Sequence, residues 1–199
     1  IEQIERFYSR FYPNWKREAY YELMSRLQVA PKQRINRMSC GQRSQVALGL
    51  ILAQDPEVLV LDDFSLGLDP GYRRLFVDYL REYAKAENKT VFLTSHIIQD
   101  MERLIDDCII MDYGRILIQM PVDELLGKFR RYTGNVREGF DAKFDATIYN
   151  PSVMRSSLEA FSMEPEEAVI KQLGANGVKN IVAERVSLED AFIGLTGKY

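Results

Sequence analysis

Two groups of polar residues have types and spacings that suit the binding of a phosphate and a metal ion. Ser39 and Gly41 precede an apolar helical pattern, so a hydroxyl group, a glycine and the unpaired N–H groups of a helix start could together hold an anion. Asp62 and Asp63 directly follow the apolar run 58–61. Carboxylates at the end of a strand can organise a magnesium–phosphate complex, so the sequence predicts a phosphate-handling site.

The segments around these residues predict how they are positioned. The runs 58–61 and 90–94 are apolar without alternation, which is typical of parallel strands buried on both faces. Between them, residues 71–86 have apolar positions at helical spacing, so a strand–helix–strand unit is expected. A helix over 97–105 and a third strand over 108–111 should extend this succession.

A single histidine, His96, follows the second strand directly after Ser95. Because ligands bind at the carboxyl ends of parallel strands, His96 should lie near Asp62 and Asp63. Taken alone, a lone histidine is more often structural than functional. Ser39 has a similarly plain alternative, since Ser39 and Gln42 have the spacing of a capping box and could simply begin a helix.

Composition limits the class of protein. The chain has 199 residues, 46% hydrophobic and 28% charged, which suits one globular domain with a small appendage. A net charge of −3 argues against a protein whose main function is to bind the phosphate backbone of nucleic acids. No apolar run approaches the ~18–20 residues of a membrane span, and two distant cysteines favour a reduced compartment. Because the chain begins at Ile1 within a helical pattern, we expect it to be part of a longer protein.

The two ends of the chain carry weaker patterns. Residues 1–30 predict two helices separated by a turn near Pro13, with most of their aromatic side chains in the core. Asp112–Arg115 predicts a hairpin turn, and Pro121 the start of a short helix. The remaining segments predict a strand over 145–149, helices over 152–161 and 166–173, a strand over 180–186, and a last helix through Leu195 that opens with a capping box at Ser187–Asp190.

The order and spacing of these segments resembles the ATP-binding subunits of ATP-binding cassette (ABC) transporters. Met38-Ser39-Cys40-Gly41-Gln42 looks like their signature L-S-G-G-Q, and Leu61-Asp62-Asp63 looks like the end of the Walker B motif. Ser65–Asp69 is similar to the D-loop, His96 to the switch histidine, and residues 187–197 to the ending common in export ATPases.

This resemblance implies an α/β fold. The expected architecture is a P-loop NTPase-like parallel sheet, the C-terminal part of an ABC ATPase, with a helical subdomain and a small α+β C-terminal appendage. The implied domains are a helical subdomain with the signature (1–54), the second part of the ATPase core (55–128) and a C-terminal accessory region (129–199).

The resemblance also implies roles for single residues, with ATP and Mg²⁺ as cofactors. In this family two ATPase subunits face each other head to tail, and each ATP lies between the P-loop of one and the signature of the other. Catalytic roles fall to Asp63, which would polarise the attacking water, and to His96, which would contact the γ-phosphate. The implied cofactor-binding residues are Ser39, Cys40, Gly41 and Gln42, with Asp69 coupling the two sites; Asp62 would hold magnesium through its waters.

Three features depart from the family pattern. Cys40 replaces a glycine of the signature, and Asp63 replaces a glutamate, which leaves its carboxylate about an ångström short of the usual position. The 199 residues contain no G-x-x-x-x-G-K-[ST], the loop and lysine that cradle the β- and γ-phosphates. We therefore expect slow hydrolysis by the intact protein and no tight ATP binding by this chain alone.

The resemblance implies a transmembrane permease and a second ATPase subunit as partners, no nucleic acid, and a cytoplasmic location on the inner face of the cell membrane. Two other functions remain open. One is a catalytically silent regulatory or interaction protein of the same fold, which the departures at Cys40 and Asp63 favour. The other is a non-transport ABC ATPase that acts on nucleic acid or ribosomes, although such proteins tend to carry long coiled coils or basic segments.

Overall fold

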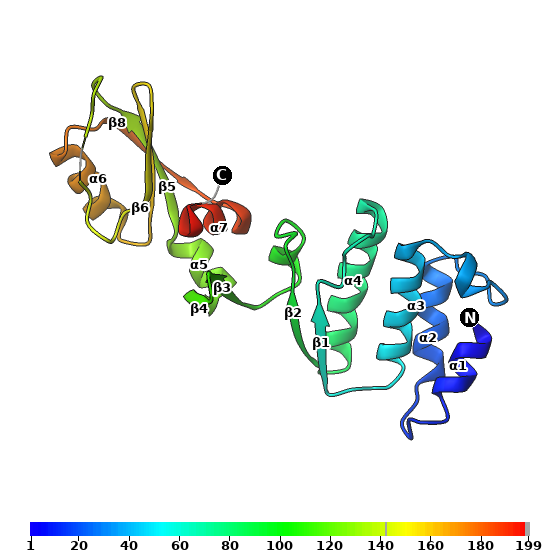
Figure 1. The fold of residues 1–199 in the computed structure, drawn as a ribbon. Coiled ribbons are helices and arrows are strands. Elements are labelled where there is room, and N and C mark those ends of the chain that lie inside the picture. Colours follow the sequence, from blue (N-terminus) through cyan, green and yellow to red (C-terminus); the bar gives the residue numbers. More distant parts are fainter. Residues whose placement is uncertain (142, 198–199) are drawn as a thin grey trace. The chain divides into compact units, whose positions relative to one another are not determined.

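The chain divides into two compact units, Ile1–Ile97 and Ile98–Tyr199 (Figure 1). The computed structural model describes residues 1–141 and 143–197. No helix in these described ranges is both long and apolar enough to cross a membrane. The fold is a mixed α/β arrangement of parallel and antiparallel strands with helices, and the predicted α/β class is confirmed. The predicted domain boundaries at 54 and 128 remain a proposal.

The first unit begins with helices and ends with a strand–helix–strand segment. Its elements are α1 (Glu2–Tyr8), α2 (Arg17–Arg26), the 3-10 turn η1 (Ile35–Arg37), α3 (Cys40–Leu52), β1 (Val58–Asp62), α4 (Pro70–Ala86) and β2 (Thr90–Thr94). The two helices predicted within residues 1–30 are confirmed. On α2, Tyr20, Leu23 and Met24 are buried as expected. The prediction of an aromatic core is wrong for Phe7 and Phe11, which are exposed and pack edge to face against each other.

Strands β1 and β2 are paired in parallel, with Val58 opposite Thr90 and Asp62 opposite Thr94. Helix α4 connects the two strands along the chain, so the predicted strand–helix–strand unit is confirmed. Burial on both faces of the strands is wrong within this unit. Leu59 and Leu61 are buried, but Val58, Val60 and Phe92 are 55%, 70% and 56% exposed. The described chain covers only one face of this two-stranded sheet.

The second unit begins with a hairpin. It contains the 3-10 turn η2 (Met101–Arg103), β3 (Asp107–Asp112), β4 (Arg115–Pro121) and α5 (Val122–Lys128). Strands β3 and β4 are antiparallel, so the predicted hairpin is confirmed, whereas a third parallel strand is not what forms here. The helix expected over 97–105 shrinks to the single turn η2. Its apolar spacing fits one turn as well as several, and so short a helix is marginal by itself.

The remaining elements form a four-stranded antiparallel sheet with the strand order β6-β7-β5-β8. They are β5 (Arg130–Asn135), β6 (Tyr149–Met154), β7 (Ser157–Ser162), α6 (Glu166–Ala175), β8 (Lys179–Arg185) and α7 (Leu188–Thr196). Figure 1 shows α6 on one side of this sheet, and Val169 and Leu173 of α6 join Tyr132 and Leu158 in its core.

Within this sheet the sequence predictions succeed for α6, β8 and α7, including the capping box at Ser187. The strand expected at 145–149 and the helix expected at 152–161 are wrong, because β6 and β7 form a hairpin there. Arg155 has a positive φ of 58° at its turn. In so short a segment the apolar spacing could not separate a helix from two strands.

A cluster of charged residues fixes the entry to β1. The carboxylate of Asp55 lies 2.7 Å from the Lys89 ammonium, just before β2, and 3.1 Å from that of Lys16. The bond from Lys89, supported by Lys16, holds the pKa of Asp55 below its ordinary value of 3.8. Asp55 has a positive φ of 54°, so the chain turns sharply there before it enters the strand that ends at Asp62.

We predict that Asp55→Asn lowers the free energy of unfolding by about 1 kcal/mol at pH 7. Because the folded-state pKa is depressed, this stabilisation is present above the ordinary value of 3.8 and is lost as the pH falls through the folded value. Urea unfolding of both proteins at pH 7 and at acid pH measures the difference. A gap of the same size at both pH values would contradict the ion-pair explanation.

Candidate functional site

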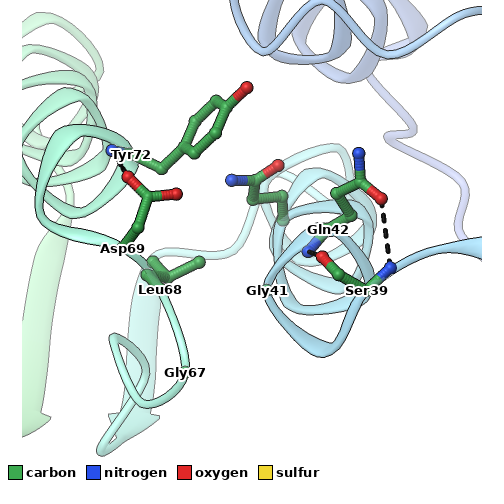
Figure 2. A pocket seen from close by; sticks show the side chains of 8 residues that line it. Ser39, Gly41, Gln42, Gly67, Leu68, Asp69 and Tyr72 are labelled. Atoms are coloured by element: carbon green, nitrogen blue, oxygen red, sulfur yellow. Dashed lines mark hydrogen bonds between the residues drawn. The ribbon is translucent and has the colours of Figure 1, made fainter.

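The start of α3 carries the residues that resemble the signature. Ser39 has extended dihedral angles (φ −62°, ψ 165°) and caps the helix. Its Oγ accepts a hydrogen bond from the Gln42 N–H at 3.2 Å, and the Ser39 N–H donates to Oε1 of Gln42 at 3.1 Å (Figure 2). The capping box predicted from the sequence is confirmed. It fixes both side chains at the helix start and leaves the positive end of the helix without an acidic residue in its first turn.

Gly41 lies against the loop that resembles the D-loop. A Cβ atom placed on Gly41 would lie 2.9 Å from the carbonyl oxygen of Gly67, so only glycine permits this approach. Gly67 itself has a φ of 78°, in the left-handed region that glycine adopts without strain. Cys40, next to Gly41, is an exposed free thiol. The helix start and the loop 65–69 are therefore in contact through backbone atoms.

Asp69 has a structural role that the sequence prediction missed. It is the N-cap residue of α4, and its Oδ1 accepts hydrogen bonds from the N–H groups of Gly71 at 3.0 Å and Tyr72 at 3.2 Å. Pro70 occupies the first helical position, where it is well tolerated. The Asp-Pro dipeptide before a helical pattern is a known start signal and could have revealed this cap. The carboxylate is thus held in place while it keeps its negative charge close to the loop.

Thr94 bonds to both aspartates at the end of β1, to the side chain of Asp62 and to the backbone of Asp63. Its hydroxyl donates to Oδ1 of Asp62 and accepts a hydrogen bond from the Asp63 N–H at 3.1 Å. The Asp63 N–H also bonds to the Thr94 carbonyl, at 3.1 Å. The parallel register puts Thr94 directly opposite Asp62, so these bonds follow from strand pairing. Sequence reasoning named Thr94 only as a strand residue and missed this contact.

Asp63 contacts His96 directly. The Oδ1 atom of Asp63 lies 2.8 Å from Nδ1 of His96, and the two side chains are 32% and 60% exposed. Asp63 has a φ of 45°, a left-handed conformation at the point where the chain leaves the strand. The structure thus brings together Asp62, Asp63 and His96 around the ends of β1 and β2. Among the described residues, no three histidine, cysteine or acidic side chains form a ready-made metal site.

A cavity of about 270 Å³ lies between the α3 start and the α4 start, and we call it the signature pocket (Figure 2). It brings together four of the predicted site residues with others that the sequence did not single out. Its lining residues are Ser39, Gly41, Gln42, Gln45, Gly67, Leu68, Asp69 and Tyr72. Gln45 is 2% exposed. Gln45 lies at helical spacing from the apolar residues Leu48 and Leu52 of α3, and a glutamine in such a pattern was the signal that could have drawn attention to it.

Comparison with solved structures defines the class of fold. A structure described as the ATP-binding subunit of an ABC transporter matches with a TM-score of 0.53 and 23% identity, covering 62% of this chain and 53% of that one. A family model described as an AAA domain, putative AbiEii toxin, Type IV TA system, matches residues 28–99. Those residues span the α3 start, both parallel strands and His96. The predicted fold class is confirmed.

Two curated relatives share a more specific description. The Nod factor export ATP-binding protein I of Rhizobium meliloti is 30% identical over 180 residues, which cover 87% of this chain and 53% of the relative. The protein of the same name from Rhizobium sp. is 29% identical and 58% covered. These comparisons confirm the resemblance: the chain is similar to ATP-binding subunits of ABC transporters. It spans about half the length of the curated relatives it matches.

We predict that Gly41→Ala destabilises the protein by about 1–3 kcal/mol, because the new methyl group would press on the Gly67 carbonyl. The matched control is Gly127→Ala in α5, where a Cβ meets nothing within 4 Å. There the change should be neutral or stabilising by about 0.5–1 kcal/mol. Thermal unfolding of the three proteins makes the comparison. Equal stabilities for the two variants would show that the loop is not packed against α3.

Proposed function

We propose that this chain is the signature-bearing part of an ATP-hydrolysing subunit that powers export through an ABC transporter. The observation that carries the proposal is the cluster at the ends of β1 and β2, where Thr94 holds Asp62 and Asp63 and where Asp63 meets His96. Carboxylates and a histidine at the ends of parallel strands suit phosphoryl transfer, which relies on positioning and electrostatics. The names of the relatives support the export direction.

In this proposal Asp63 orients and polarises the attacking water. His96 lies within hydrogen-bond distance of the Asp63 carboxylate, and its ring would contact the γ-phosphate. Ser39, Cys40, Gly41 and Gln42 present the α3 start to the ATP held by a second ATPase subunit, with Asp69 coupling the two sites. The confirmed cap orients these groups before any nucleotide arrives.

The donor set at the strand ends fits magnesium in part. The ion prefers oxygen ligands, keeps several waters, and in nucleotide sites is bound by one or two carboxylates together with phosphates. Asp62 and the hydroxyl of Thr94 supply such oxygens. We propose that Asp62 holds Mg²⁺ through its waters. Bound there, the ion would neutralise charge that develops on the phosphates.

The exposed apolar face of β1 and β2 supports a further part of the proposal. Val58, Val60 and Phe92 are more than half exposed, although their strands have the continuous apolarity of buried ones. We propose that a P-loop-bearing part of the ATPase packs on this face and supplies the missing phosphate loop. The assembled subunit would bind a transmembrane permease and a second ATPase subunit at the inner face of the cell membrane.

A second candidate is a regulatory protein that keeps the fold without the activity. The specific observation that favours it is the contact of Asp63 with His96, because a short carboxylate already engaged by a histidine has less freedom to reach a water. The two functions differ in whether Asp63 affects turnover.

We predict that Asp63→Asn in the intact protein lowers the ATPase rate by about 10²–10⁴-fold, because the amide oxygen of asparagine is uncharged and far less basic than a carboxylate and polarises the water poorly. His96→Ala should reduce the rate as well. The matched control is Glu57→Gln. It removes a carboxylate directly before the first residue of β1, at the end of the strand away from Asp63, and should leave turnover unchanged. Phosphate release under saturating ATP measures all four proteins. An unchanged rate for Asp63→Asn would support the regulatory candidate.

For the chain by itself we predict no micromolar ATP affinity, since its 199 residues lack the loop and lysine that cradle the β- and γ-phosphates. Isothermal titration of the chain with Mg–ATP is the direct measurement. The same titration with the intact protein is the positive control. Micromolar binding to the chain alone would mean that another group on it grips the phosphates.

A further inference from the structure

The signature pocket contains an unpaired hydrogen-bond acceptor and a carboxylate, and its lining includes no positively charged side chain. Oε1 of Gln45 is fully buried and has no hydrogen-bond partner among the described residues. Asp69 adds a carboxylate on the opposite side, held by the N–H groups of α4. None of the eight lining residues is a lysine or an arginine. An unpaired buried acceptor is costly, so the pocket is incomplete as it stands.

The missing group should be a planar donor with a positive charge. Gln45 and Asp69 offer acceptors from two helices, and Tyr72 lies beside Asp69 with an aromatic ring (Figure 2). A guanidinium group has several N–H donors in a flat fork and stacks on aromatic rings, whereas an ammonium is a strongly hydrated point charge. The cavity of about 270 Å³ leaves room for such a group. An inorganic anion would meet the Asp69 carboxylate and would leave the Gln45 oxygen unpaired.

We propose that the signature pocket is a socket for an arginine side chain of the partner ATPase subunit. This inference rests on the proposed function for the identity of the partner. The guanidinium would bond to Oε1 of Gln45 and pair with Asp69. It would also offset the negative charge of Asp69, so that a phosphate could approach the start of α3 at Ser39 and Gln42.

The test uses the chain itself, with methylguanidinium as the probe and no nucleotide present. In a ¹⁵N-labelled sample the side-chain amide of Gln45 should shift saturably as the probe is added. Asp69→Asn should weaken binding by about tenfold or more, since it removes the charge of a charge-assisted bond while asparagine still caps α4. The matched control is Asp78→Asn, an exposed carboxylate farther along α4, which should bind the probe as the unmodified chain does.

Gln45→Leu provides a second variant that should remain folded, because it replaces an unpaired buried polar group with an apolar one of similar size. It should be at least as stable as the unmodified chain and bind the probe several-fold more weakly. Because this variant has no Gln45 amide, its binding is measured from the backbone amides of Gly71 and Tyr72 beside Asp69, and the same signals are compared in the unmodified chain. Binding that is unaffected by Asp69→Asn and Gln45→Leu would overturn the proposal. So would saturable shifts of the Gln45 amide with inorganic phosphate but none with methylguanidinium.

The outcome is independent of hydrolysis. If methylguanidinium binds as expected but Asp63→Asn leaves the ATPase rate of the intact protein unchanged, the socket stands and the proposed catalytic function fails. If the rate falls but no guanidinium binds, the function stands and the socket fails.

Discussion

The close approach of Gly41 to the Gly67 carbonyl is the contact on which the rest of the signature pocket depends. It brings the first turn of α3 against the loop that leads to α4, with the side chain of Leu68 packed beside the contact. The capping box holds the start of α3, and the cap formed by Asp69 holds the end of the loop. Joining the two through backbone atoms therefore fixes the positions of Ser39 and Asp69 relative to each other without any direct bond between their side chains. The geometry is set before a ligand is present, which is what a site built for positioning requires.

Strand pairing fixes the positions of the residues at the ends of β1 and β2 in the same way. Once β1 and β2 are parallel and in register, Thr94 must lie opposite Asp62, and its hydroxyl reaches both that carboxylate and the next N–H group. Asp63 then leaves the strand in a left-handed conformation that directs its carboxylate to His96. A left-handed aspartate carries a conformational cost. Here two bonds to its N–H group and one contact to its carboxylate offset that cost, so the bend is part of how the site is held.

How much of the structure could be predicted from the sequence differs from element to element. The capping box at Ser39, the strands around Asp62 and the position of His96 were predictable because each depends on local chemistry or on one strand pairing. The cap formed by Asp69 could have been predicted from the Asp-Pro pair, but the resemblance assigned Asp69 to the D-loop and its capping role was not considered. The prediction of a helix over residues 152–161 was wrong. The apolar residues of this segment have a spacing that fits a helix as well as a hairpin, and only the pairing of β6 with β7 selects the hairpin. The position of Gln45 in an apolar helical pattern was visible in the sequence, but its unpaired Oε1 atom was not, since that results from packing between two helix starts that lie far apart in the chain.

The two helix starts that meet at the signature pocket have opposite electrostatic character. An α-helix carries about half a positive charge at its start. On α3 the capping groups of Ser39 and Gln42 are neutral, so this partial charge remains available to an anion. On α4 the cap is the full negative charge of Asp69, which exceeds the partial charge of the helix and leaves that side of the pocket negative. One wall of the pocket therefore attracts a phosphate and the other repels it. A subunit that depended only on its own residues would gain little from such an arrangement. If a second chain supplies a cation, the repulsive wall becomes favourable only when that chain is in place, so tight phosphate binding would be coupled to assembly.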